Sequence, residues 1–260
     1  MSGPEPGPSL PPGTGGSEAA RVPEGRRWGA GPDPDAAAVR ADLGRAARTG
    51  DPEVVFAEGK TPAQAAAAVT ALVEGGVRPA LVTRASEAHA TAITAAHPAA
   101  TFHTDCGVVV VGGRAPADGR VGRVAIVTAG TSDLRVAREC QVVLEALGEE
   151  PRLEVDVGVA GLHRILDVRP VLEAATVVVV VAGMEAALAP VVAGLVPAPV
   201  VAVPTSVGYG AAQGGLTALH GLLAACTPGI AVVNVDNGLG AALLARRILA
   251  AAGGGEGQAP

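Results

Sequence analysis

The sequence is poor in aromatic residues: its 260 residues include one Trp, one Tyr and two Phe. A core must therefore be packed from Ala, Val and Leu, whose small side chains suit close contact between helices and a sheet. The chain is 49% hydrophobic and only 17% charged, which is enough for a full core in one or two domains.

Clusters of positive charge are also lacking. The net charge is -6, and Lys and Arg nowhere gather into a run. This distribution argues against a track for nucleic-acid phosphates. A small anionic ligand held by a few local cations is still compatible with it.

The sequence has few cysteines and lacks the apolar segment of a signal peptide. Cys106, Cys140 and Cys226 share no metal-ligand spacing and cannot all pair, which is typical of a reduced, cytoplasmic protein. Residues 186–219 carry no charge, but prolines interrupt them. We therefore expect a buried helix, strand and loop there, and no membrane span.

Residues 121–133 set the plan of the second half of the chain. The apolar, mostly β-branched residues 124–127 predict a strand buried on both faces, followed by a small polar loop. Apolar residues then recur at helical spacing up to Gly148, so Thr131 or Ser132 is expected to cap an amphipathic helix. A strand, a polar loop and a helix N-terminus together form an anion site.

The same plan repeats along the rest of the chain. Small-residue loops and helical segments follow each of the predicted strands at about 123–128, 153–158, 177–182, 199–203 and 230–235. This alternation predicts a doubly wound, flavodoxin-like parallel sheet of five strands. Its ligand is expected at the strand carboxyl ends.

Upstream, the sequence predicts a smaller α/β domain at 35–118, joined by an Asp118-Gly119 turn to a catalytic domain at 119–251. The Pro- and Gly-rich residues 1–34 and the tail at 252–260 are expected to be disordered. The elements expected in the small domain are helices at 35–49, 61–75 and 86–96 and strands at 53–57, 80–83 and 106–111. Capping residues Thr61, Gln64 and Ser86 mark two of the helix starts.

The rare polar residues of the second half gather in the loops at the strand ends. Thr131, Ser132 and Asp133 are either a helix cap with an acidic first turn, or a site for phosphate and ribose hydroxyls. His163 and Arg164 are either a cap and a surface group, or a pair that binds an anion and moves a proton. The G-x-G-x-x-G fingerprint is absent, which disfavours hydride transfer.

Two further residues have a structural and a functional interpretation. Glu185 follows five valines, and it either stabilises a helix N-terminus or, if desolvated, acts as a base near neutrality. Cys226 shares a helical stripe with Leu219 and Leu222, which is typical of a core position. The helix breaks directly after Cys226, which also allows its sulfur to face a ligand crevice, and the residues alone leave this undecided.

The loop motifs together resemble those of the LarB family, the pyridinium-3,5-biscarboxylic acid mononucleotide synthases of nickel-pincer cofactor assembly. The motifs are T-A-G-T-S-D, D-V-G-V-A-G-L-H-R, A-G-M-E, V-P-T-S-V-G-Y-G and V-N-V-D-N-G, with E-G-K-T and T-R upstream. The resemblance covers about residues 35–250. The carboxyl half also resembles aminoimidazole ribonucleotide carboxylases of the PurE type, so a PurE-like fold is expected there.

The resemblance implies an enzyme that is both a carboxylase and a hydrolase. Its substrates would be nicotinic acid adenine dinucleotide, carboxylated at ring position 5, and CO2. Hydrolysis of the phosphoanhydride would then release AMP, with magnesium assisting and no organic cofactor. The resemblance further implies a homo-oligomer, an octamer in relatives, with no nucleic-acid or membrane partner.

The family's nucleophilic cysteine matches Cys226, because P-G and V-N-V-D-N-G follow it. The resemblance implies that its thiolate adds to the pyridinium ring, that Glu185 takes the ring proton, and that His163 takes part in catalysis. The residues expected to bind substrate are Thr131, Ser132, Asp133, Arg164, Gly183, Met184, Thr205, Ser206, Tyr209, Asp236, Asn237, Lys60 and Arg84. Of these, Lys60, Arg84 and Arg164 are expected to neutralise phosphate; no metal ligands can be assigned.

The chain departs from the family pattern in places, and two other functions stay open. Ala186 stands where glycine is expected after A-G-M-E, and Ala224 and Ala225 precede Cys226 where relatives carry polar residues. One alternative is a ribonucleotide carboxylase or mutase of the purine pathway. The other is a non-catalytic nucleotide-binding module.

Overall fold

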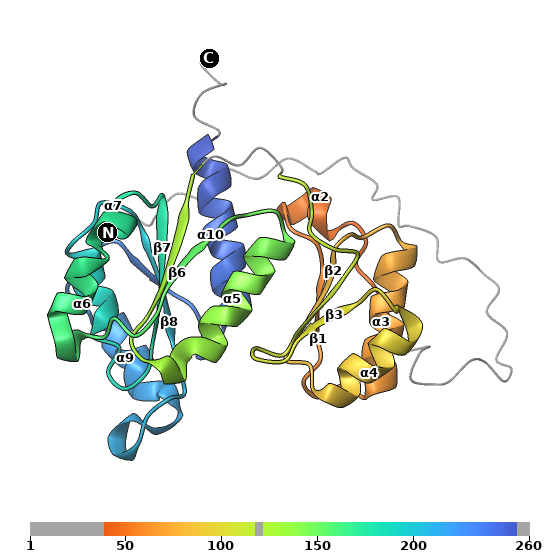
Figure 1. The fold of residues 1–260 in the computed structure, drawn as a ribbon, viewed down its shortest axis with the longest axis horizontal. Helices are drawn as coiled ribbons and strands as arrows, with labels where there is room; N and C mark the ends of the chain where they lie inside the picture. The colour runs from red at the N-terminus through yellow and green to blue at the C-terminus, as the bar shows by residue number, and fades with distance from the viewer. Residues whose placement is uncertain (1–38, 118–121, 254–260) are drawn as a thin grey trace, which may run out of the picture. The chain divides into compact units, whose positions relative to one another are not determined.

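A computed structural model describes residues 39–117 and 122–253. Both tails predicted to be disordered and the Asp118-Gly119 turn lie wholly or largely outside these residues. The described residues all belong to one compact unit. Its described residues fold into a five-stranded and a four-stranded sheet, shown in Figure 1.

The five-stranded sheet is parallel throughout, which confirms the predicted fold class. Its strands in spatial order are β6 (Arg152–Glu154), β5 (Val124–Thr128), β7 (Val177–Ala182), β8 (Val200–Pro204) and β9 (Ile230–Val232). The chain leaves β5 toward β6 on one side and then continues from β7 on the other. The topological switch point, where such sheets bind ligands, therefore lies between the carboxyl ends of β5 and β7.

Alternate residues of the central strands face two separate cores. Val177, Val179 and Val181 of β7 pack with α5 (Leu134–Ala146) and α10 (Gly238–Gly253). Val178 and Val180 pack on the opposite face, which is covered by a second set of helices (Figure 1). These are α6 (Leu162–Asp167), α7 (Arg169–Glu173), α8 (Leu188–Ala193) and α9 (Leu216–Leu223). Burial on both faces explains the continuous run of valines.

The four-stranded sheet is mixed. Its strands in spatial order are β1 (Val54–Phe56), β2 (Ala80–Thr83), β4 (Val108–Val111) and β3 (Thr101–His103), and only the β1 and β2 pair is parallel. One face packs against α3 (Pro62–Glu74) and α4 (Glu87–Ala96). The other face places Leu81, Val108 and Val110 in the same core as α5 and α10.

Local signals placed the helix starts of the small sheet correctly. Thr61 and Gln64 form the predicted capping box of α3, and Ser86 caps α4 together with His89. The predicted helix at 35–49 is wrong over most of its described residues, because only α2 (Arg45–Thr49) is helical. Most helices are stabilised by packing an apolar face against the rest of the protein. Helix α2 buries no residue, so no such packing stabilises a longer helix here.

Three predictions about the other elements were also wrong. The sequence pattern missed β3 entirely, and β6 and β9 end at Glu154 and Val232 because turns follow them. Neither Thr131 nor Ser132 caps α5, since both lie in a short 3-10 turn, η1 (Thr131–Asp133). Two other 3-10 turns follow, η2 (Val159–Gly161) and η3 (Gly210–Gly215).

A buried ion cluster joins α10 to the segment before β1. The Arg246 side chain is 4% exposed, and its Nε donates to Asp51 Oδ1 at 2.8 Å. Its Nη1 donates to Glu149 Oε1 at 2.7 Å and to the carbonyl of Leu147 at 2.6 Å. These bonds fix the attachment between the two sheets.

None of the helices in the described residues is both long and apolar enough to cross a bilayer.

Candidate active site

Backbone strain concentrates at the carboxyl ends of the strands. Within the described residues, the non-glycine residues with positive φ are Arg84, Asp156, Met184, Ala186 and Asp236, with φ between 54° and 61°. Each follows the end of a strand by a few residues. Such conformations cost on the order of 1 kcal/mol each and persist where the surrounding structure enforces them, often at functional sites.

A cavity of about 360 Å³ lies at the switch point, and we call it the switch-point cavity. It is lined by the loops after β5, β6 and β7 and by Val207 of the loop after β8. The structure brings together here six of the predicted site residues: Ser132, Asp133, Arg164, Gly183, Met184 and Glu185. This is the place where a doubly wound sheet is expected to bind its ligand.

Asp133 is buried beneath this cavity and joins two of its loops. Its Oδ1 accepts a hydrogen bond from Thr205 Oγ1 at 2.6 Å, and its Oδ2 accepts one from the amide of Gly130 at 3.0 Å. Burial raises the pKa of Asp133, while these hydrogen bonds act in the opposite direction. Because both oxygens contact the protein, Asp133 is well placed to hold the loops after β5 and β8 together.

A tight turn presents Glu185 to the cavity. Gly183 leaves no room for a side chain, since a Cβ there would lie 2.2 Å from the carbonyl oxygen of Val207. The amide of Met184 donates to that same carbonyl at 3.0 Å. Met184 and Ala186 both have φ of 54°, and Glu185 between them is exposed. The left-handed backbone at Ala186 explains why glycine suits this position.

The loop after β6 contributes one of its two predicted residues to the cavity. Arg164 lines the cavity, and its Nη1 lies 2.8 Å from Asp156 Oδ2 and donates to the Asp156 carbonyl at 2.8 Å. The Arg164 side chain is 35% exposed, so the residue is only partly covered by the protein. His163 is exposed and does not line the cavity, and the same holds for Thr131.

Cys226 is exposed on the connection between α9 and β9, so the interpretation as a core cysteine is wrong. It does not line the switch-point cavity. The preceding helix packs against the Glu185 turn, because a Cβ at Gly221 would lie 2.9 Å from the Glu185 carbonyl oxygen. Cys106 and Cys140 are buried, and burial raises the pKa of the Cys106 thiol to about 12. Cys226 is therefore the accessible thiol.

A second cavity, of about 440 Å³, lies at the carboxyl ends of β2 and β9, and we call it the inter-sheet cavity. Arg84 lines it, with Nε 3.4 Å from Glu139 Oε1 and Nη2 donating to the carbonyl of Asp236. Burial raises the pKa of Glu139, and the Arg84 charge lowers it. Asp236 and Asn237, two more of the predicted residues, line this cavity, and Asp236 Oδ1 accepts from the amide of Ser206 at 2.8 Å.

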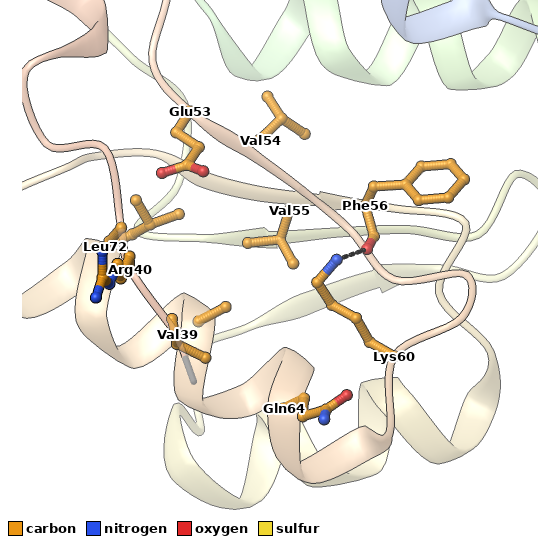
Figure 2. Close-up of a pocket in the computed structure, with 11 residues that line it drawn as sticks. Val39, Arg40, Glu53, Val54, Val55, Phe56, Lys60, Gln64 and Leu72 are labelled. Atoms are coloured by element: carbon orange, nitrogen blue, oxygen red, sulfur yellow. Dashed lines mark hydrogen bonds between the residues drawn. The ribbon is translucent and has the colours of Figure 1, made fainter. Parts of the chain in front are cut away.

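Lys60 and Tyr209 lie apart from both cavities. Lys60 lines a separate hollow of about 400 Å³ between β1 and α3, where its Nζ donates to the Phe56 carbonyl at 2.7 Å (Figure 2). Tyr209 is 77% exposed. The predicted contacts of these two residues with substrate stay predictions.

The described residues contain no group of three or more His, Cys, Asp or Glu side chains arranged to hold a metal ion. Magnesium binds in proteins through one or two carboxylates together with substrate phosphates. The side chains in the described part of the chain thus supply no closed magnesium site, and we assign no chemical step to the ion.

The sequence analysis did not predict three residues that lie at or near the cavities, which are Glu139, Thr83 and Gly221. It did predict Gly183 and Asp133. Glu139 is a charged residue beside Cys140 on the buried side of an amphipathic helix. A carboxylate at a position that the pattern predicts to be buried was the signal that could have identified it. The close approach at Gly221 leaves no local signal, because it depends on contact with a distant turn.

Fold and cavity together define an α/β protein with a cavity at the switch point of a parallel sheet. Residues 34–113 match the family described as LarB/PurE-like N-terminal domain, and residues 123–254 match AIR carboxylase. The chain therefore belongs to the AIR carboxylase family and carries the LarB/PurE-like N-terminal domain, which confirms the predicted family. This membership indicates a carboxylase-related function.

The chain is also similar to a protein from an archaeon and to a solved structure. The chain is 38% identical over 215 residues to the uncharacterized protein MJ0165 of Methanocaldococcus jannaschii, covering 80% of this chain and 82% of that protein. It is also similar to the crystal structure of a PurE2 variant of Treponema denticola, with 24% identity and a TM-score of 0.42. That similarity covers 50% of this chain and 80% of the other.

Proposed function

We propose that the protein carboxylates the pyridinium ring of nicotinic acid adenine dinucleotide with CO2 and hydrolyses the phosphoanhydride. The products would be pyridinium-3,5-biscarboxylic acid mononucleotide and AMP, for nickel-pincer cofactor synthesis. The observation that carries the proposal is the Glu185 turn. Two strained residues and a glycine in close contact hold this exposed carboxylate over the switch-point cavity.

The electronic nature of the ring dictates the need for a nucleophile. A pyridinium ring is electron-poor and does not attack CO2. Addition of the Cys226 thiolate to a ring carbon gives an enamine, whose electron pair forms the new bond to CO2. Glu185 then accepts the proton from the carboxylated carbon. The C–S bond breaks, the thiolate leaves and aromaticity returns, so the net change replaces a ring C–H by C–COO⁻ and releases one proton.

Three more of the predicted residues, which lie at the switch-point cavity, fit the binding of a nucleotide. Ser132 and the partly exposed Arg164 line the switch-point cavity and are suited to a phosphate next to the reacting ring. Asp133 has its two oxygens engaged by Thr205 and Gly130 and so acts as a positioning residue.

We also propose that the protein works as a homo-oligomer. Helix α9 exposes Leu216 and Leu223, which are 58% and 66% exposed and lie seven residues apart on one face. Light scattering coupled to size-exclusion chromatography tests this, and a monomer at working concentration would contradict it.

The test of the proposed reaction is incubation of the full chain with nicotinic acid adenine dinucleotide, bicarbonate and magnesium, analysed by mass spectrometry. The proposal predicts a dicarboxylated mononucleotide and AMP, and it predicts that Cys226→Ser abolishes both ring carboxylation and the thiol adduct. Thr227→Ser changes the neighbouring residue and serves as the matched control. Turnover of aminoimidazole ribonucleotide in a parallel assay would favour the purine-pathway carboxylase, and no turnover of either substrate would favour a binding module.

A further inference from the structure

The inter-sheet cavity has the size and position of a ligand site. Its volume of about 440 Å³ lies within the range of small-molecule sites. It is built from Thr83 and Arg84 at the end of β2, from Phe56 at the end of β1, and from residues 234–237 after β9. Two of the strained residues, Arg84 and Asp236, meet in it.

Thr83 provides a polar group that the protein leaves unsatisfied. The residue is 1% exposed, it lines the cavity, and its Oγ1 has no hydrogen-bond partner among the described residues. A buried hydroxyl without a partner costs about 1–3 kcal/mol. Such a group is expected where a ligand completes the hydrogen bond.

The charges around the cavity disfavour phosphate. Three carboxylates line it, those of Glu58, Glu139 and Asp236, against the single guanidinium of Arg84. Arg84 is already engaged by Glu139 and by the Asp236 carbonyl. Carboxylates in excess suit a ligand that offers hydroxyl donors, such as a ribose.

The remaining lining residues suit a flat base. Aromatic residues are scarce in this chain, and one of them, Phe56, is 49% exposed. Figure 2 shows that its ring points away from Val55, on the opposite side of the strand. Asn234 Oδ1 accepts from the Val235 amide, and Asn237 Oδ1 accepts from the Gly240 amide. These bonds leave the two side-chain NH2 groups as donors to a ligand.

The two cavities flank the same loop, residues 205–207. Thr205 bonds to Asp133 beneath the switch-point cavity, and the Ser206 amide bonds to Asp236 in the inter-sheet cavity. Because Thr205 and Ser206 are adjacent in the chain, these two bonds place the cavities close together. A ligand with two nucleoside halves thus has a place for each on either side of this loop.

We propose that the inter-sheet cavity binds a nucleoside, with the base against Phe56 and the ribose hydroxyls on the carboxylates of Glu58 and Asp236. The assignment of this site to the adenosine half of the dinucleotide rests on the proposed function. The inference that the cavity binds a nucleoside does not depend on that function.

Isothermal titration of the full chain with adenosine, and separately with AMP, tests this inference without any turnover. Wild type is expected to bind adenosine, and Phe56→Ala is expected to weaken binding about tenfold or more. Leu166→Ala removes another half-exposed apolar side chain, outside the cavity, and is expected to leave binding unchanged. Thr83→Val is the second variant: it should raise the melting temperature of the free protein and yet weaken adenosine binding, which a purely structural threonine would not do.

The results separate this inference from the proposed reaction. If wild type fails to bind millimolar adenosine, or if Phe56→Ala binds it as tightly as wild type, the inference is overturned even when dinucleotide is carboxylated. If adenosine binding depends on Phe56 and Thr83 but no carboxylation occurs, the nucleoside site stands and the proposed reaction fails.

Discussion

The switch-point cavity and the inter-sheet cavity differ in how their charged groups are used. In the inter-sheet cavity, Arg84 and Glu139 pair with each other and the carboxylate is buried. In the switch-point cavity, Glu185 is exposed and forms no ion pair with any described residue. The comparison teaches that one site holds its guanidinium against a buried carboxylate, which suits recognition, while the other site keeps an exposed carboxylate available for proton transfer.

The largest expected effect comes from Glu185→Gln. Loss of a general base should lower the carboxylation rate about 10²- to 10⁴-fold. Because Glu185 is exposed, the free energy of unfolding should change by less than about 0.5 kcal/mol. Rate assays and urea denaturation measure the two effects. Glu74→Gln, another exposed glutamate, is the control, and unchanged turnover in Glu185→Gln would remove the base assignment.

Arg246→Met tests the attachment of the two sheets, on which the inter-sheet cavity depends. Removing one partner of a buried ion cluster should lower the free energy of unfolding by about 3–5 kcal/mol. The neighbouring Arg247 is 55% exposed and lies 3.8 Å from Asp51, so Arg247→Met should cost about 1 kcal/mol or less. Equal losses in both variants, measured by urea denaturation, would contradict the buried cluster.

A smaller effect is expected in the pH dependence of stability. The pKa of Asp133 is raised in the folded protein, so the folded state holds this proton more tightly than the unfolded chain. The stability that Asp133 gains from this tighter proton binding is fully present below the pKa of an unfolded Asp, about 3.9. It is lost as the pH rises through the pKa of Asp133 in the folded protein. Denaturant titrations at a series of pH values measure the free energy of unfolding. Above about pH 4 it should decline less steeply in Asp133→Asn than in wild type. Parallel curves for the two proteins would count against the raised pKa.

The smallest effect concerns the strain in the Glu185 turn. Ala186→Gly should raise the free energy of unfolding by about 0.5–1 kcal/mol, since Ala186 has φ of 54°. Ala187 has φ of −60°, so Ala187→Gly should lower it by about 0.5–1 kcal/mol. Thermal unfolding of both variants gives the comparison, and the same sign in both would contradict the assigned strain.

Much of the parallel sheet could be predicted from the sequence, because buried strands such as β7 are continuous apolar runs with small residues at their ends. The capping box at Thr61 and Gln64 placed α3, and the cap at Ser86 placed α4, for the same reason: their signals are local. The short strand β3 could not be found, since only pairing with β4 defines it. The ends of β6 and β9 were missed because strained turns at Asp156 and Asp236 replace regular pairing.

The candidate site was predictable where a motif lies at one strand end, and less so where distant segments meet. The loops carrying Ser132, Arg164 and Glu185 do converge, as expected from the carboxyl ends of parallel strands. Lys60 does not join them, because its ammonium turns back to its own strand at Phe56. The partners of Glu139, and the residues that line the cavity with Thr83, come from elements far apart in the chain, and no local pattern reports them.

Trapping of the adduct tests the central claim most directly, because it asks whether Cys226 and Glu185 act on the same ring. The Glu185→Gln variant would be incubated with nicotinic acid adenine dinucleotide and bicarbonate, and then analysed by intact mass and peptide mapping. The account predicts an accumulated substrate adduct on Cys226 that is absent from the double variant with Cys226→Ser. An adduct on another residue, or full carboxylation by Cys226→Ser alone, would contradict it.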